Sequence, residues 1–157
     1  MRRIAVFLSA WLLGAAASAD GIRLPPVDHA ATLEECGACH LAYPPQMLPA
    51  RSWGRIMDSL ADHFGEDASL AEAVSADIAA YLRANAADSP GAVGGQRFMR
   101  RLDPAQTPLR ITETPWWQRD HDEIRPARFE SAKVKSRANC AACHRTADKG
   151  EFLEDDE

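Results

Sequence analysis

The sequence predicts a mainly α-helical protein with two small domains, of which the first is regular and the second is less regular and rich in loops. Apolar residues recur at three- and four-residue steps over residues 53–82, as they do on the buried face of amphipathic helices. Residues 89–95 have the glycine and proline content of a linker. The stretch that follows this linker shows no sustained period, so we expect less regular structure there.

The first 19 residues have the pattern of an export signal. They comprise a short positive region at residues 1–3, an apolar stretch at residues 4–17 and a small-residue cleavage site that ends at Ala19. The apolar stretch is too short to span a bilayer comfortably. We therefore predict cleavage after Ala19 and a periplasmic protein; an uncleaved membrane anchor is the alternative.

The linker divides the remaining chain into an N-terminal domain, residues 20–88, and a C-terminal domain, residues 96–157. Loss of two of the 18 basic residues with the export signal leaves 16 against 23 acidic residues, a net charge of −7. This balance argues against nucleic acid and an anionic membrane face as partners, and suits a redox partner with a basic docking patch. A chain of this length could not build two sizeable cores from side chains alone.

All four cysteines lie in a C-x-x-C-H motif that occurs twice. The motif residues are Cys36, Cys39 and His40 near the front, and Cys140, Cys143 and His144 near the end. This spacing is typical of c-type haem attachment, in which two cysteines form thioether bonds to the vinyl groups and the adjacent histidine binds the iron. We therefore interpret the chain as carrying two covalent haems, whose apolar bulk would complete its cores.

A C-x-x-C pair has three other common uses. A redox dithiol of the thioredoxin type requires a strand-helix-strand setting, which the sequence does not show. A four-cysteine zinc site would require motifs about a hundred residues apart to converge, and it would leave the two histidines unexplained. Two disulfides would suit an exported chain but would make the repeated histidine a coincidence.

In the N-terminal domain, two segments around the first motif are expected to lack regular structure. Residues 20–35 are predicted to be an extended lead-in, because Leu24-Pro25-Pro26 disfavours helix and strand. Residues 43–49 form a proline-punctuated loop that could pack against one face of a haem.

Two helices should follow this loop. The apolar stripe predicts a first helix over residues 52–64, with His63 on the same face. Ser69 and Glu72 have the spacing of a capping box at the start of a second helix, which should end near residues 85–88.

The C-terminal domain should begin with an irregular stretch, residues 96–113, that includes a short helix around residues 96–102 and a short strand near residues 109–112. Its four arginines could neutralise haem propionates by bidentate contacts, or they could be ordinary solvated charges. The acidic tail, residues 151–157, is expected to fray apart from Phe152 and Leu153.

Two helices are predicted to carry the chemistry of this domain. Thr114-Pro115 looks like an N-cap followed by proline at the first helical position. His121 lies four residues after Trp117 and so on the same helical face. A second helix over residues 136–147 should bear the second motif.

Each iron also needs a ligand on its far side, and three histidines remain. His63 and His121 stand on apolar faces rich in aromatic residues, where a haem edge would pack. A lone histidine on such a face is more often a core residue, but two irons require ligands here and neutral imidazole is a good one. These two are therefore predicted as distal ligands, with His29 as the substitute. The methionine alternatives are Met47, Met57 and Met99.

Several short segments together resemble one family, the bacterial dihaem cytochrome c called DHC. In the N-terminal half they are residues 36–45, Leu48-Pro49, Ser52-Trp53 and Asp62-His63-Phe64-Gly65; in the C-terminal half they are Arg110-Ile111-Thr112, Trp116-Trp117, His121 and residues 134–144. The resemblance covers nearly the whole chain after the export signal. It implies a first domain like a small class I cytochrome c, a less regular haem domain after it, and bis-histidine ligation of both haems.

By matching positions, the resemblance implies that His40 and His63 hold the first iron and that His144 and His121 hold the second. A crossed pairing between the two domains would also give two six-coordinate irons, so this alternative stays open. The resemblance assigns no role to His29.

Two imidazoles on each iron would leave no open position, so we expect an electron carrier and not an enzyme, and bis-histidine ligation with acidic surroundings favours a low potential. The resemblance implies its partners. The carrier would pass electrons from a membrane b-type cytochrome to a small soluble monohaem cytochrome, the sphaeroides haem protein, and would contact the membrane protein only peripherally or transiently. Two alternatives differ in leaving one iron open: a dihaem peroxidase-like enzyme, and a haem-based ligand sensor.

Overall fold

The computed structural model describes residues 21–153, so the predicted export signal lies outside the described residues. Short helices joined by loops dominate this part of the chain, and the prediction of a mainly helical protein is confirmed for it. In chain order its helices and strands are β1 (Gly21–Arg23), α1 (Ala30–Gly37), α2 (Ala50–Met57), α3 (Glu72–Ala84), α4 (Gln96–Met99), α5 (Pro115–Asp120), α6 (Pro126–Phe129) and β2 (Glu151–Leu153). Helical turns of the 3-10 type lie between them: η1 (Pro45–Met47), η2 (Leu60–Asp62), η3 (Ile111–Glu113), η4 (Cys140–Ala142) and η5 (Ala147–Lys149). No helix within residues 21–153 is long and apolar enough to cross a membrane.

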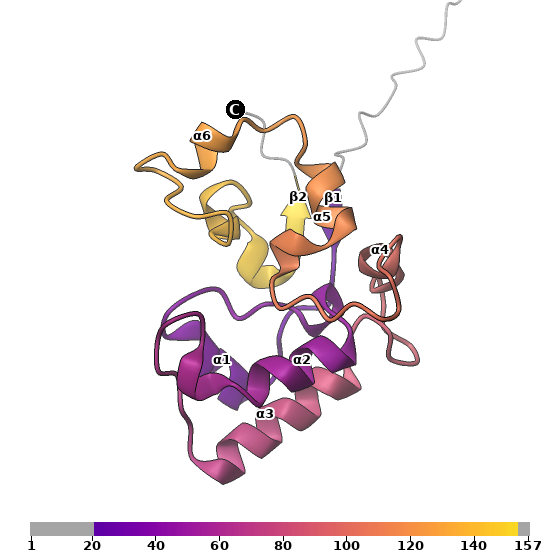
Figure 1. Cartoon of the computed structure of the whole chain (residues 1–157), viewed down its shortest axis with the longest axis vertical. Coiled ribbons are helices and arrows are strands. Elements are labelled where there is room, and N and C mark those ends of the chain that lie inside the picture. The colour runs from indigo at the N-terminus through magenta and orange to yellow at the C-terminus, as the bar shows by residue number, and fades with distance from the viewer. Residues whose placement is uncertain (1–20, 154–157) are drawn as a thin grey trace, which may run out of the picture.

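Helices α1, α2 and α3 lie together at one end of the molecule (Figure 1). Both α1 and α2 contact α3. The side chains buried between them form one core: Leu48, Trp53, Ile56, Met57, Ile78, Leu82 and Ala86. The indole Nε1–H of Trp53 donates to the carbonyl of Pro45 at 2.7 Å, which holds the proline loop against α2.

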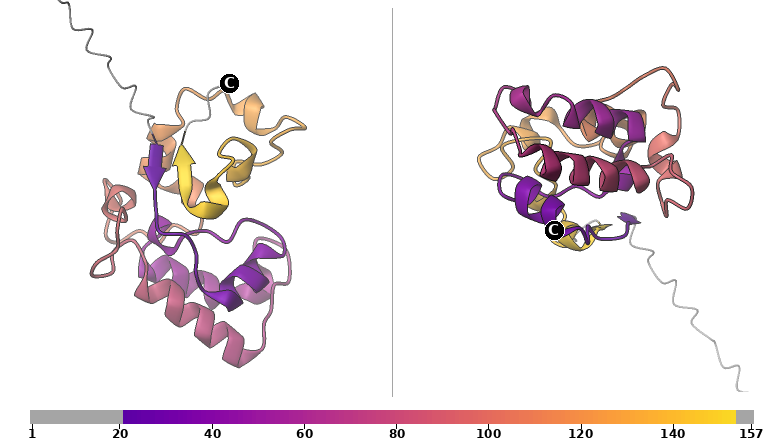
Figure 2. Two further views of the ribbon diagram at one scale, coloured as in Figure 1. Left: turned by 180° about the vertical axis from the view of Figure 1, so that it is seen from behind. Right: turned by 90° about the horizontal axis from the view of Figure 1, so that it is seen from below.

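A second core lies at the other end, under α4, α5 and the sheet. Its buried residues include Ile22, Leu24, Met47, Phe98, Trp116, Trp117, Phe129, Val134 and Phe152. The strands β1 and β2 pair antiparallel, with Ile22 opposite Phe152, and Figures 1 and 2 show them side by side. The two ends of the described chain therefore meet in one small sheet. The division into two domains stays a prediction.

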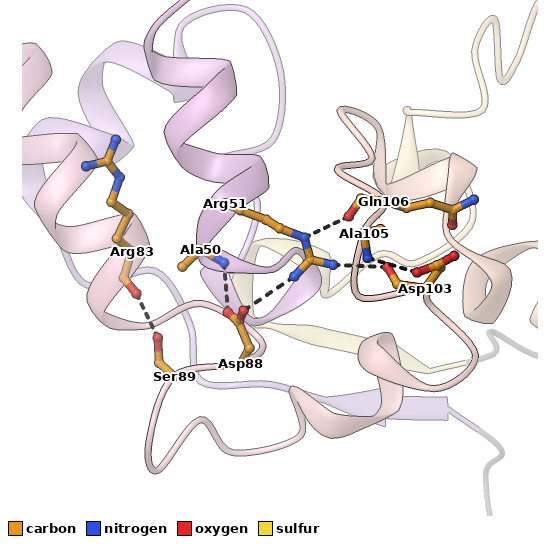
Figure 3. Close-up of polar contacts among 8 residues, drawn as sticks. All are labelled: Ala50, Arg51, Arg83, Asp88, Ser89, Asp103, Ala105 and Gln106. Carbon is orange, nitrogen blue, oxygen red and sulfur yellow. Dashed lines mark hydrogen bonds and ion pairs between the residues drawn. The ribbon is translucent and has the colours of Figure 1, made fainter.

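Arg51 on α2 connects three segments (Figure 3). Its Nε–H donates to the carbonyl of Gln106 at 2.7 Å, and a terminal nitrogen lies 3.4 Å from the carbonyl of Asp103. The guanidinium also lies 3.6 Å from the carboxylate of Asp88, which accepts from the N–H of Ala50. The loops before and after α4 are thus attached to the start of α2.

The helix predicted over residues 52–64 is wrong in its second half. Helix α2 ends at Met57, because the hydroxyl of Ser59 donates to the carbonyl of Arg55 and so competes for the helical hydrogen bonds. After η2 the backbone reverses, with positive φ angles at Phe64 and Gly65. His63 therefore lies in a turn and not on a helical stripe.

The capping box is also wrong, although the end of the second helix is confirmed. Helix α3 begins at Glu72 after Ala71, and no side chain caps it. The N–H of Ser69 instead donates to the side chain of Asp67 at 2.9 Å in a local turn. The segment of residues 20–35, predicted to be extended, also contains more structure than expected. Pro26 is its last proline, so residues 30–37 can form helix α1.

In the second half, the start of α5 is confirmed and two other elements are corrected. Thr114 accepts from the N–H of Trp117 at 3.3 Å as the N-cap, and Pro115 follows it. The segment 136–147 is not a helix but forms η4 and η5, because the side chain of Asn139 donates to the carbonyl of Val134 and bends the chain. The strand expected near residues 109–112 is the turn η3.

The start of the acidic tail does not fray. Residues Glu151–Leu153 form β2, and Phe152 is buried in the second core. The short helix around residues 96–102 is confirmed as α4.

Substitution of Arg51 by Met should lower the free energy of unfolding by about 1–2 kcal/mol, because it removes two hydrogen bonds to carbonyls and one ion pair that is partly exposed. Chemical denaturation of the haem-loaded protein measures this. The control is Met at Arg55, an exposed residue on the same helix, where we expect a change within about 0.5 kcal/mol. Equal losses in the two variants would contradict a specific role for Arg51.

Candidate metal centres

The first C-x-x-C-H motif lies at the end of α1 and in the turn that follows it. Cys36 is in the last turn of α1 and is half-buried, whereas Cys39 is exposed. The ring of His40 is held by its own neighbour, because Nδ1–H donates to the carbonyl of Leu41 at 2.7 Å. This hydrogen bond leaves Nε2 as the nitrogen that can bind a metal.

The structure brings His63 opposite His40. Their ring centroids are 6.1 Å apart, and the ring planes are inclined by 23°. An imidazole nitrogen binds a transition metal at about 2 Å, so two imidazoles on opposite sides of one metal place their centroids roughly 6 Å apart. Burial, followed by the nearby His40 and Arg110, lowers the pKa of His63 and favours the neutral form that binds metals. This pair fits a six-coordinate iron.

The second motif lies in η4 and the turn after it, and His144 from this motif faces His121. Their centroids are 6.2 Å apart, close to the separation in the first pair, but their planes are nearly perpendicular at 85°. Each ring donates its Nδ1–H to a carbonyl: His121 to Trp117 at 2.9 Å, and His144 to Leu153 at 2.8 Å. Both rings therefore present Nε2 to the space between them.

Trp117 holds His121 in two ways. Besides accepting the hydrogen bond through its carbonyl, it stacks its indole on the imidazole at 4.3 Å with 14° between the planes. Burial lowers the pKa of His121 more than the hydrogen bond raises it, so the neutral form is favoured here too.

The structure places the histidines of each pair within one half of the chain, and it does not show the crossed pairing between the two halves. His40 meets His63, and His121 meets His144. That these four side chains bind iron stays a prediction, which the two distances support.

His29 lies away from both pairs. Its Nδ1 is hydrogen-bonded to the hydroxyl of Thr32 at 3.0 Å, and its Nε2 lies 3.3 Å from the carboxylate of Asp77. The ring stacks on Tyr81 at 4.5 Å. Both ring nitrogens are thus engaged between α1 and α3.

The methionine alternatives do not stand opposite the motif histidines in these pairs. Met47 and Met57 are buried in the two hydrophobic cores, and Met99 packs against the second core. In each pair the ring facing the motif histidine is an imidazole.

Positive side chains lie on aromatic rings beside both pairs. The guanidinium of Arg110 is 3.8 Å from the ring centroid of Phe64, the residue after His63. The guanidinium of Arg137 is 5.1 Å from the ring of Phe129, which in turn packs on Trp117. Arg110, one of the four arginines singled out between residues 96 and 113, therefore lies near the first histidine pair.

Sequence reasoning missed Tyr43, which links the two sites. Its ring stacks on His40 at 5.0 Å, and its hydroxyl donates to the carbonyl of Ala138, two residues before Cys140, at 2.8 Å. Burial, and then the Cys140 sulfur, raises the pKa of Tyr43 to about 12, so the hydroxyl keeps its proton and remains a donor. The partners are 95 residues apart, and no local pattern marks such a contact.

The other uses of the cysteines fit the structure poorly. No disulfide joins any of the four cysteines, all of which lie within residues 21–153. Within residues 21–153, no group of three or more His, Cys, Asp or Glu side chains could hold a metal ion. The two motifs therefore do not form a shared zinc site.

Two sites of this kind, each with a C-x-x-C-H motif and a second histidine opposite, define a dihaem c-type cytochrome. The profile of one such family, the dihaem cytochrome c family DHC, matches residues 32–152. The chain belongs to the dihaem cytochrome c family. It carries two covalently bound c-type haems, and it is a haem protein of an electron-transfer family.

Solved structures agree with this family. A diheme cytochrome c from Rhodobacter sphaeroides is 52% identical, with a TM-score of 0.73, and the match covers 80% of this chain and 98% of that one. DHC purified from the same organism is 49% identical, with a TM-score of 0.67 and coverage of 80% and 97%. A diheme cytochrome type c from Shewanella baltica is 39% identical, with a TM-score of 0.61 and coverage of 77% and 84%. No curated protein matches the chain.

Phe in place of Tyr43 should lower the free energy of unfolding by about 1 kcal/mol, because it removes one hydrogen bond and leaves the Ala138 carbonyl without this partner. The ring still stacks on His40, so the visible spectrum should not change. Denaturation of the haem-loaded protein measures the loss. Phe at Tyr81, whose exposed hydroxyl lies 3.4 Å from Asp28, is the control and should cost less. A larger loss at Tyr81 would contradict the role of the Tyr43 hydroxyl.

Proposed function

We propose that this chain is an exported, low-potential electron carrier in which two histidines bind each haem iron. The observation that carries the proposal is the pair of imidazole separations, 6.1 Å for His40 and His63 and 6.2 Å for His121 and His144. The cysteines that would form the thioethers are Cys36 and Cys39 for the first haem, and Cys140 and Cys143 for the second.

The bound haems supply one-electron chemistry between ferrous and ferric iron. The chain itself would hold one iron with His40 and His63 and the other with His121 and His144. His63 and His121 are the residues that would keep oxygen and peroxide away, since a ligand could enter only by displacing one of them. A peroxidase-like enzyme or a ligand sensor would require one of these positions to be open, so the two imidazole pairs favour the carrier.

Low potentials follow from the same residues. A carbonyl that accepts from Nδ1–H makes the imidazole a stronger electron donor and so stabilises ferric iron. His40, His121 and His144 each have such a carbonyl. The acidic balance of the chain, −7 after loss of the export signal, acts in the same direction because negative charge stabilises the more positive iron.

Partners and location are inferred from charge and from family resemblance. The export pattern of residues 1–19 supports a periplasmic carrier, and its acidic surface suits a partner with basic residues around its redox centre. The resemblance favours a membrane b-type cytochrome as donor and a small soluble monohaem cytochrome, such as the sphaeroides haem protein, as acceptor. Contact with the membrane protein would be peripheral or transient.

The visible spectrum of the purified haem protein tests the closed coordination. We expect low-spin bands for both haems, unchanged when carbon monoxide is added after reduction. A high-spin fraction, or a carbon monoxide adduct that forms at one haem, would favour the enzyme or the sensor.

Alanine at His63 or at His121 should each convert one of the two haems from low spin to high spin, because the iron loses its distal imidazole. Electron paramagnetic resonance of the oxidised protein measures this change, and half of the total haem should become high spin in each variant. Alanine at His29 is the control, since its ring binds Thr32 and Asp77, and both haems should stay low spin. If the His29 variant alone loses a low-spin signal, the ligand assignment is wrong.

A further inference from the structure

The two motif histidines are held by different parts of the chain. His40 donates to the carbonyl of the residue beside it, Leu41, so this hydrogen bond needs no distant segment of the chain. His144 donates to the carbonyl of Leu153, nine residues further on and inside strand β2. The ring of Phe152, also in β2, packs on the imidazole of His144 at 5.8 Å. The second site is therefore oriented by a strand.

Strand β2 is held from two sides. Toward the motif, the N–H of Glu151 donates to the carbonyl of Thr146 at 3.2 Å. On its other side it pairs with β1, residues Gly21–Arg23, which come from the opposite end of the described chain (Figures 1 and 2). Without β1, the second support of β2 would be missing.

The contact between the strands is close and requires glycine at two places. A Cβ on Gly21 would lie 2.7 Å from the Cα of Leu153, the residue whose carbonyl accepts from His144. Gly150, just before β2, has a φ of +77° and would bring a Cβ into collision with the carbonyl of Leu24. The N–H of Leu24 donates to the carbonyl of Gly150 at 2.9 Å.

An apolar anchor fixes the same register. Ile22 and its partner Phe152 are 5% and 7% exposed and belong to the second core, which also contains Trp117 behind His121. A shift of β1 by one residue would turn Ile22 out of this core. Register and orientation of β2 are thus set by β1.

We propose that β1 is a positioning element for the second haem: through β2 it places the Leu153 carbonyl that orients the motif ligand His144. This inference rests on the proposed function, because it takes His144 as an iron ligand. Loosening β1 should weaken the hydrogen bond at Nδ1, make the imidazole a poorer electron donor and move the reduction potential of the second haem to a more positive value. The first haem, whose His40 is held locally, should keep its potential.

The first test is a matched pair of cavity variants in the full haem-loaded chain. Ile22→Ala removes the anchor of β1, and Ile78→Ala makes the same change in the other core, at a residue that is 0% exposed. Redox titration should show a shifted reduction potential for one haem, the second, in the Ile22 variant. The potential of that haem should stay unchanged in the Ile78 variant. The His121→Ala variant identifies which low-spin signal belongs to the second haem.

The second test is a matched pair of glycine variants. It separates the effect of disturbing the contact between β1 and β2 from the effect of backbone strain at a positive φ. Gly150→Ala places a Cβ at a residue whose φ is +77° and in collision with Leu24. Gly91→Ala places a Cβ at a residue whose φ is +82°, with nothing within 4 Å of it. We expect the shift of the second haem only in the Gly150 variant.

The proposal is overturned if Ile22→Ala lowers stability while both potentials and both low-spin signals stay unchanged, or if only the first haem responds. Failure of the proposed function would be seen separately, as a high-spin or carbon monoxide-binding haem in the unsubstituted protein.

Discussion

An imidazole binds a metal in a fixed direction through Nε2 only when the rest of its ring is held, and in this chain backbone carbonyls hold most of the rings. Within residues 21–153, three of the four paired histidines donate Nδ1–H to a carbonyl: His40, His121 and His144. The accepting carbonyls belong to a loop, helix α5 and strand β2. If these histidines bind the irons as proposed, those segments must be in place for the rings to be oriented, and a loop-rich chain then needs a defined backbone at these points.

The two sites meet this requirement differently. His40 and its carbonyl are neighbours, and His63 lies in a turn closed by backbone hydrogen bonds between His63 and Glu66. The first site is thus built beside the three-helix core from residues close in sequence. The second site needs α5, the 3-10 turns of the motif and a strand whose partner is at the other end of the described chain. Tyr43 stacks on the first site and bonds to the segment before the second, so the two are not mechanically independent.

The two covalent haems were predictable from the sequence because C-x-x-C-H is a local pattern. The start of α5 was predictable because threonine is favoured as an N-cap and proline at the first helical position, and Thr114 and Pro115 occupy these places. The pairing of β1 with β2 was not, since strands of three residues show no periodicity and their partners are about 130 residues apart. The helix expected over residues 136–147 failed because Asn139 uses its side chain on the carbonyl of Val134, an option that apolar spacing does not reveal. His63 was singled out because it shares a predicted helical stripe, but it lies in a turn that faces His40, and its binding of iron stays a prediction.

In the proposed carrier, the hydrogen bond at Nδ1 of His40, His121 or His144 would serve two purposes. By holding the ring it would keep the coordination unchanged between oxidation states, which favours electron transfer, and by polarising the ring it would lower the reduction potential. Orientation and potential cannot then be adjusted separately at a ligand whose carbonyl lies in a rigid segment. Ring orientation and reduction potential can then differ between the two haems only through the segment to which the accepting carbonyl belongs. Since Leu41 is next to its own histidine and Leu153 lies in a strand, our proposal makes the second haem the one whose properties depend on how the ends of the described chain are joined.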